Sequence, residues 1–152
     1  MLICNKLSEA KQLLGDKGTA VALGTFDGVH IGHQSIIQRA MNLAKAHKLV
    51  SVVYTFSNHP LEQIAPDKVP MQIGDNISKA DILKAMGVQM LVNVAFNEKL
   101  CRQSPETFID ELCRSLNPHY LVTGPNFFFF VFVYGNFRML LRMGEDYGFL
   151  AE

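Results

Sequence analysis

The sequence predicts an α/β fold in which helices cover both faces of a doubly wound parallel sheet. Three observations support this prediction. Short apolar segments rich in β-branched residues recur at 19–23, 49–56, 89–95 and 119–123. Segments with helical spacing of apolar residues separate them, and no long linker interrupts the alternation. Strands interleaved with helices pair in parallel through right-handed crossovers, which gives the doubly wound arrangement.

The first strand and helix come from residues 19–47. Thr-Ala-Val-Ala-Leu at 19–23 is a short buried strand. A helix follows, because apolar residues then repeat with helical spacing at Ile36, Ile37, Ala40, Leu43 and Ala44. The second strand, 49–56, is a nearly continuous apolar run of the kind found in central parallel strands.

Three prolines then mark an irregular excursion over residues 57–75. The next helix runs to about Met86. Asn76 or Ser78 can cap its first turn, and Asp81, three residues after Ser78, is a candidate capping partner.

Gly87 ends this helix, and residues 89–95 form the third strand. Ser104 caps the following helix. Pro105 occupies its first turn, where the missing N–H has no intrahelical partner to lose. Residues 119–123 form the fourth strand.

Composition predicts one water-soluble cytoplasmic domain over residues 1–152. Lys and Arg total 14 and balance 14 Asp and Glu, so bulk charge does not favour nucleic acid or an acidic membrane as partner. The N-terminus lacks the blocks of a signal peptide, and no apolar run approaches the ~20 residues of a membrane helix. Three cysteines without a Cys-x-x-Cys pair indicate free thiols.

The segment Gly24-Thr-Phe-Asp-Gly-Val-His-Ile-Gly-His33 carries most of the functional information. It places two histidines at a strand-to-helix junction. Unpaired backbone N–H groups and the helix dipole favour an anion there, typically phosphate, and imidazoles add donors or positive charge. A zinc site stays open but weak, because no Cys or carboxylate pair lies at ligand spacing. A Walker loop is excluded, since no Gly-Lys-Ser/Thr follows the glycines.

Three polar or glycine-rich segments follow strands of the predicted sheet. The run from Gly24 follows the first strand, Ser57–Pro60 the second, and Gly124–Phe127 the fourth. Doubly wound sheets bind ligands beyond the carboxyl ends of their strands. The strand order therefore predicts a single cleft at that edge.

The segment at 24–33 resembles the nucleotide-binding motif of the HxGH nucleotidyltransferase superfamily, and more narrowly that of bacterial bifunctional riboflavin kinase/FAD synthetases. Thr-Phe-Ser-Asn-His-Pro at 55–60, the segment 79–94 and Ser-Pro-Glu-Thr-Phe-Ile at 104–109 are also similar to that family. The resemblance implies a Rossmann-like sheet of the HxGH type. It also implies transfer of AMP from Mg-ATP to FMN, giving FAD and pyrophosphate.

The resemblance implies a role for each motif residue. His30 and His33 would stabilise charge on the ATP phosphates, and Asp27 would orient the loop or help with the ion, although a plain turn-stabilising role stays open. The remaining nucleotide contacts would come from Gly24, Thr25, Phe26, Gly28 and Gly32. The FMN pocket would be shaped by Thr55, Asn58, His59 and Pro60, with Gly124, Asn126, Phe127 and Phe129 as further binding residues. No residue is assigned as a metal ligand.

The segment 124–136 departs from the family pattern. Pro125 replaces an acidic residue and Phe130 a glycine, and no charged residue occurs between Ser115 and Phe137. Such a run is β-prone and uncharged. Three interpretations stay open: a buried strand, an apolar patch over 127–134 that binds a flavin ring, a partner chain or a second copy, or a loop that no longer supports catalysis.

The C-terminal part predicts a weaker enzyme. The family's Ser-Ser-Thr-x-x-Arg segment and its riboflavin kinase domain are absent from the sequence. Adenylyl transfer is therefore expected to be slow or lost. The alternatives are a nucleotidyltransferase of the same superfamily acting on another phosphorylated acceptor, or a nucleotide- or flavin-binding module without turnover.

Overall fold

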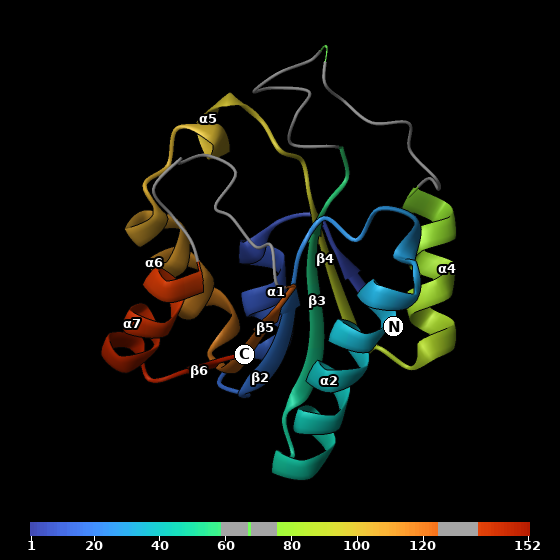
Figure 1. Ribbon diagram of the computed structural model, residues 1–152, viewed down its shortest axis with the longest axis horizontal. Coiled ribbons are helices and arrows are strands. Elements are labelled where there is room, and N and C mark those ends of the chain that lie inside the picture. Colours follow the sequence, from blue (N-terminus) through green and yellow to red (C-terminus); the bar gives the residue numbers. More distant parts are fainter. Residues whose placement is uncertain (59–66, 68–75, 125–136) are drawn as a thin grey trace.

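The computed structural model describes residues 1–58, 67, 76–124 and 137–152. Its strands form one parallel sheet in the order β1-β4-β3-β2-β5-β6 (Figure 1). The strands are β1 (Leu2–Cys4), β2 (Thr19–Leu23), β3 (Val50–Phe56), β4 (Met90–Val94), β5 (Pro118–Thr123) and β6 (Leu150–Ala151). The helices are α1 (Leu7–Leu14), α2 (Ile31–His47), α4 (Asn76–Met86), α5 (Glu98–Cys101), α6 (Pro105–Leu116) and α7 (Phe137–Tyr147).

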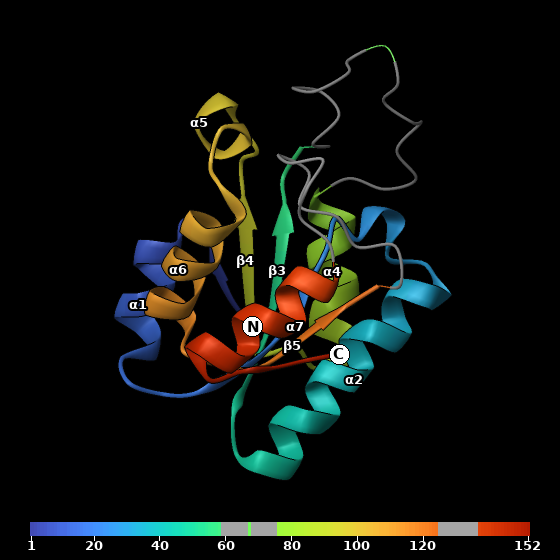
Figure 2. The ribbon, with the colours of Figure 1, turned by 60° about the vertical axis from the view of Figure 1, so that its left-hand side comes forward.

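Helices cover both faces of the sheet. Helices α1, α6 and α7 pack on one face, and α2 and α4 pack on the other (Figure 2). This three-layer arrangement confirms the predicted doubly wound α/β fold. Among the described residues, every helix is too short or too polar to cross a bilayer.

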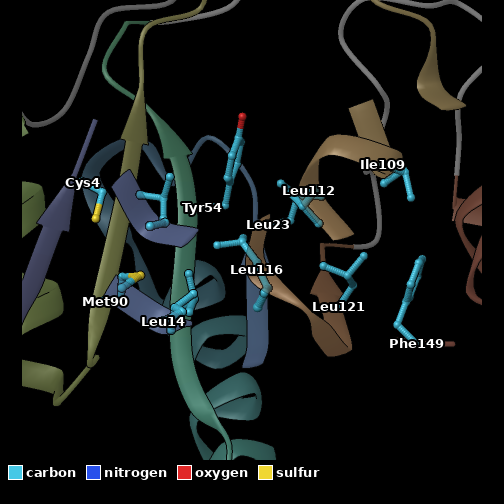
Figure 3. Close-up of a cluster of buried hydrophobic side chains, with 14 of the residues drawn as sticks. Cys4, Leu14, Leu23, Tyr54, Met90, Ile109, Leu112, Leu116, Leu121 and Phe149 are labelled. Carbon is cyan, nitrogen blue, oxygen red and sulfur yellow. The ribbon is translucent and has the colours of Figure 1, made fainter. Parts of the chain in front are cut away.

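The larger core lies between the sheet and the helices α1, α6 and α7 (Figure 3). Tyr54 enters it from β3 and Leu121 from β5. Leu112 and Leu116 enter it from α6. All four are at most 1% exposed. Leu112 and Leu116 lie four residues apart and therefore share the buried face of α6.

The four strands and three helices expected between residues 19 and 123 are all present. Ser104 caps α6 by accepting a hydrogen bond from the Thr107 N–H at 3.1 Å, and Gly87 follows α4 with φ +100°. One expectation is wrong. Helix α4 begins at Asn76, so Asn76 and Ser78 both lie inside the helix and neither is the capping residue that precedes it.

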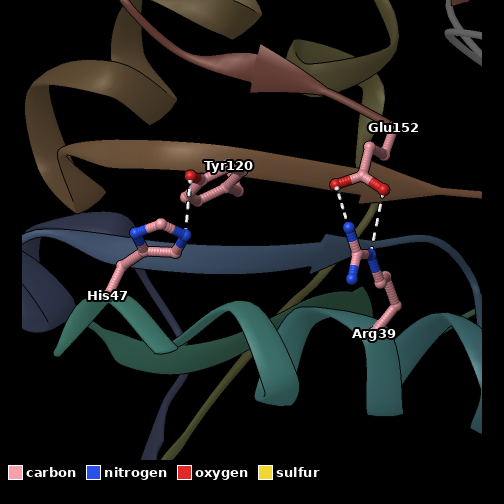
Figure 4. A network of polar contacts seen from close by, with 4 residues as sticks. All are labelled: Arg39, His47, Tyr120 and Glu152. Atoms are coloured by element: carbon pink, nitrogen blue, oxygen red, sulfur yellow. Dashed lines mark hydrogen bonds and ion pairs between the residues drawn. The ribbon is translucent and has the colours of Figure 1, made fainter. Parts of the chain in front are cut away.

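Two polar contacts join the long helix α2 to strand β5 and to the C-terminal residue (Figure 4). Arg39 forms a two-pronged ion pair with Glu152, with N–O distances of 2.9 and 3.2 Å. At the last residue of the helix, His47 Nε2 lies 3.0 Å from the Tyr120 hydroxyl of β5. The buried residues Ile37, Ala40, Leu43 and Ala44 seat α2 on the sheet, and these exposed polar contacts add to that packing.

The strand order reverses direction beside β2. From β2 the chain winds through β3 to β4, and then returns to place β5 on the other side of β2. Loops that leave neighbouring strands in opposite directions open a crevice at the carboxyl ends of those strands, and such crevices bind ligands in α/β proteins. The segment 24–33 leaves β2 at this point.

Candidate active site at the carboxyl end of β2

The loop between β2 and α2 has an unusual backbone. Phe26 and Val29 adopt left-handed φ angles of 47° and 43°, and Gly28 lies between them with φ 70°. A β-branched residue such as valine rarely adopts this conformation, so the surroundings must compensate for its strain. Buried contacts do so in part, because Phe26 and Val29 are at most 2% exposed. The loop is therefore anchored at two side chains, with glycine where the backbone turns.

His30 and His33 lie together at the N-terminus of α2. His30 is the N-cap, and its Nδ1 accepts a hydrogen bond from the His33 backbone N–H at 3.4 Å. The two rings stack with centroids 3.5 Å apart and planes 24° apart. Gly32 permits this arrangement, since a Cβ there would lie 3.1 Å from the His30 ring. The structure thus brings together the two histidines that the sequence singled out.

His33 lies deeper than His30. The edge of its ring meets the ring of Phe26, with centroids 5.4 Å apart. Its Nδ1 is buried and has no hydrogen-bond partner among the described residues. Burial lowers the pKa of His33, the neighbouring His30 and Lys79 lower it further, and Asp27 opposes them. His33 is therefore neutral at pH 7 in the free protein and carries an unused polar nitrogen.

The lowered pKa of His33 predicts how stability depends on pH. Below about pH 6.5 the unfolded chain takes up a proton at this histidine more readily than the folded chain does. The free energy of unfolding should therefore fall as the pH drops through this range. We expect His33→Gln to lessen that fall, as measured by urea unfolding at about pH 7.5 and about pH 5.5. An identical fall in both proteins would contradict the prediction.

Two predicted glycines lie where a side chain would be tightly packed. A Cβ on Gly24 would lie 3.1 Å from the Phe26 ring. A Cβ on Gly124 would lie 3.3 Å from the Cδ1 of Ile36 in α2. Gly124 thus follows β5 directly beside the helix that carries the histidines, and two of the three predicted motifs adjoin there.

Thr55 and Asn58 represent the predicted acceptor motif at the end of β3. The Thr55 hydroxyl donates to the carbonyl oxygen of Thr25 at 2.7 Å and so joins this motif to the β2 loop. The Asn58 amide donates to the Phe96 carbonyl at 2.9 Å, and its oxygen accepts from the Phe96 N–H at 2.7 Å. Asn58 therefore also braces the chain beyond β4. The other predicted residues, His59, Pro60, Asn126, Phe127 and Phe129, lie outside the described residues.

Lys79 belongs to this region, although the sequence analysis did not assign it to the site. Its ammonium group is buried against the ends of β2 and β3 and donates to the carbonyl oxygen of Thr25 at 3.1 Å. The helical spacing of Lys79 and a buried leucine is the sequence signal that indicates this position. Lys79 precedes Leu83 by four residues, so it shares the buried face of α4.

Helix α7 carries two cationic side chains, Arg138 and Arg142. Both are exposed on α7. That helix packs on the opposite face of the sheet from α2, which carries the histidines. Among the described residues, the charged side chains at the site are therefore Lys79 and Asp27, beside the two imidazoles.

The sequence is similar to known proteins over most of its length. The family model for FAD synthetase matches residues 14–152. A bifunctional riboflavin kinase/FMN adenylyltransferase of Bacillus subtilis is 36% identical over 120 residues, which cover 78% of this chain and 36% of that protein. A protein of the same name from Escherichia coli is 32% identical over 146 residues, covering 95% of this chain and 45% of that one. The chain thus spans less than half the length of these two relatives.

Solved structures share the fold. A macrolide-efflux protein from Streptococcus pneumoniae matches with TM-score 0.75 and 21% identity over 99% of this chain and 49% of the other. A pantoate-β-alanine ligase from Francisella tularensis matches with TM-score 0.66 and 16% identity over all of this chain and 66% of the other. At these identities the likeness concerns the fold alone. The match over residues 14–152 is decisive for the family: this chain belongs to the FAD synthetase family.

Proposed function

We propose that the chain is an FMN adenylyltransferase. A phosphate oxygen of FMN attacks the α-phosphorus of ATP, and the bond from that phosphorus to the oxygen bridging to the β-phosphate breaks. The products are FAD, which keeps the AMP group, and pyrophosphate. The attacking phosphate is already a nucleophile, so positioning of the two substrates and stabilisation of charge supply most of the catalysis.

The two histidines suit this chemistry. Because His30 Nδ1 accepts a hydrogen bond, the neutral ring carries its proton on Nε2, which can donate to a phosphate oxygen. His33 is neutral at pH 7 and has an unpartnered nitrogen. An incoming triphosphate would favour its protonated form, because the negative charge opposes the effects that lower its pKa. Both groups would then stabilise charge on the departing pyrophosphate.

Magnesium would enter with ATP as part of the substrate. Among the described residues no three metal-ligating side chains gather, and Asp27 is the carboxylate whose charge acts on both His33 and Lys79. Mg²⁺ is commonly held by one or two carboxylates together with substrate phosphates, and a single Asp27 fits that arrangement. The ion would neutralise phosphate charge there.

FMN is the proposed acceptor because the curated relatives carry that activity in their names, and because Thr55 ties the acceptor motif to the nucleotide loop. The three cysteines are free thiols, which suits a reducing compartment. We therefore place the reaction in the cytoplasm. Another phosphorylated acceptor remains the competing substrate.

The stacked histidine pair at the N-terminus of α2 is the observation that carries the proposal. The test is to incubate the purified chain with Mg-ATP and FMN, and to detect FAD and pyrophosphate by chromatography. Riboflavin is the matched control, since it has the same ring system without the attacking phosphate. FAD formed from FMN and nothing from riboflavin is the expected result. Binding of both substrates without FAD would contradict the enzyme and identify a binding module.

A further inference from the structure

We propose that Lys79 is a positioning residue for the nucleotide loop, defined as residues 24–30. Its buried ammonium group fastens the Thr25 carbonyl to the end of β3, and this fixes the direction of the Phe26 N–H. The inference rests on the proposed function only in naming a nucleoside triphosphate as the ligand of the loop.

The ammonium group has one acceptor for each of its three N–H bonds. Lys79 Nζ lies 3.1 Å from the Thr25 carbonyl oxygen, 3.1 Å from the Phe56 carbonyl oxygen and 3.4 Å from Thr55 Oγ1. The Thr55 hydroxyl itself donates to the Thr25 carbonyl at 2.7 Å. The Thr25 carbonyl therefore receives two hydrogen bonds, and Lys79 links two neighbouring strand ends from a third element, α4.

Burying this ammonium group lowers the stability of the folded protein. Lys79 is 8% exposed, and its partners among the described residues are two carbonyls and a hydroxyl rather than a carboxylate at ion-pair distance. Burying a charge without an opposite charge beside it is unfavourable. Burial accordingly lowers the pKa of Lys79, with Asp27 opposing that effect from a distance. We therefore infer that the buried ammonium group serves the site, by holding the backbone of the nucleotide loop.

What it holds is the peptide that links Thr25 to Phe26. In a trans peptide the C=O and the following N–H point in opposite directions. Two donors fix the Thr25 carbonyl on the Lys79 side, so the Phe26 N–H points away from Lys79. Within the described part of the chain, this N–H has no acceptor. Lys79 thus holds in place a backbone donor that no described residue uses.

The neighbouring strand end behaves differently. Lys79 also holds the Phe56 carbonyl, but the next N–H, that of Ser57, donates to the Val94 carbonyl at 2.9 Å and completes the sheet. The rigid end of β3 therefore serves as the fixed point. The β2 loop, strained at Phe26 and Val29 with φ 47° and 43°, is the part that requires an external restraint.

The test compares Lys79→Met with two controls on the same helix. Leu83→Ala, one turn further on and fully buried, weakens the hydrophobic cluster that Leu83 shares with Phe26 and Val29 but leaves the hydrogen bonds of Lys79 in place. Lys84→Met removes an equal charge from an exposed position. Hydrogen exchange of the amides of residues 24–30 is measured in the free proteins. The dissociation constant of Mg-ATP and its KM are then measured for each variant.

We expect Lys79→Met alone to raise amide exchange in the nucleotide loop and to weaken Mg-ATP binding about tenfold or more, as for loss of hydrogen bonds from a charged group. KM for ATP should rise more than kcat falls. Equal loosening of the loop in Leu83→Ala, or unchanged exchange in Lys79→Met, would overturn the proposal. If Lys79→Met does not fold, Thr55→Val is the substitute, because it removes the hydroxyl that donates to the Thr25 carbonyl and accepts from Lys79. Thr55→Val should raise the exchange of the same loop amides to a smaller extent. Unchanged exchange in Thr55→Val would overturn the proposal.

The two proposals fail in different ways. A wild-type chain that neither binds Mg-ATP nor forms FAD would refute the proposed function. The exchange measurement needs no ligand, so it would still decide whether Lys79 holds the loop.

Discussion

Replacing His33 by alanine is expected to lower the rate of FAD formation by about 10²-fold or more, the usual effect of removing one preorganised donor to a developing negative charge. The structure explains why this side chain should matter so much. His33 is half-buried between the His30 ring and the Phe26 ring, and its Nδ1 is buried without a partner among the described residues. Alanine removes that nitrogen and the stacking partner of His30 together.

The measurement is kcat and kcat/KM for FAD formation at saturating FMN, with His47→Ala as the control. His47 lies at the far end of the same helix, against Tyr120 of β5. His47→Ala tests whether the loss of a histidine elsewhere on α2 also slows the reaction. A folded His33→Ala protein with unchanged kinetics would refute the catalytic role of His33, and an equal loss in His47→Ala would show that the effect passes through the helix as a whole.

A loss in kcat would have a different meaning from a rise in KM. If His33 stabilises charge only as the pyrophosphate leaves, kcat and kcat/KM should fall together. If it only binds the triphosphate of the ground state, KM should rise with little change in kcat. The first result is expected, because His33 is neutral in the free protein and gains a favourable charge only when phosphate negative charge is near it.

The sequence predicted the centre of this fold better than its edges. Strands β2, β3, β4 and β5 carry nearly continuous apolar runs because both faces of each are covered. The edge strand β1 is three residues long, with Leu2 and Ile3 about half exposed, and β6 has two residues. Segments this short give no periodic pattern, and their place in the sheet comes from tertiary pairing.

The sequence predicted the residues of the site that are close together in the chain and missed Lys79, which is far from them. The histidines follow from local sequence, because the glycines and the start of the helix are contiguous with them. Lys79 is more than forty residues away in the chain, and its partners are mainly backbone carbonyls, which have no sequence signature. A lysine on the buried face of a helix is the pattern that would have identified it.

The second large effect is expected at α7, a helix that the sequence analysis did not predict. Leu140→Ala should lower the free energy of unfolding by about 2–5 kcal/mol, the usual range for removing a fully buried leucine side chain. Leu140 is 0% exposed and belongs to the core beneath α1, α6 and α7. The helix is tightly seated, since a Cβ on Gly144 would lie 2.4 Å from the Phe149 carbonyl oxygen. It therefore has little freedom to move into the space left by alanine.

The neighbouring Leu141 gives the matched control. It has the same side chain on the same helix but is 46% exposed, so Leu141→Ala should change stability by no more than about 0.5 kcal/mol. Urea unfolding of both variants decides the point. Equal losses would mean that α7 is rotated or unseated, and the larger core would then lose one of its three covering helices. A loss confined to Leu140 would show that α7 meets the sheet with the face that carries Leu140.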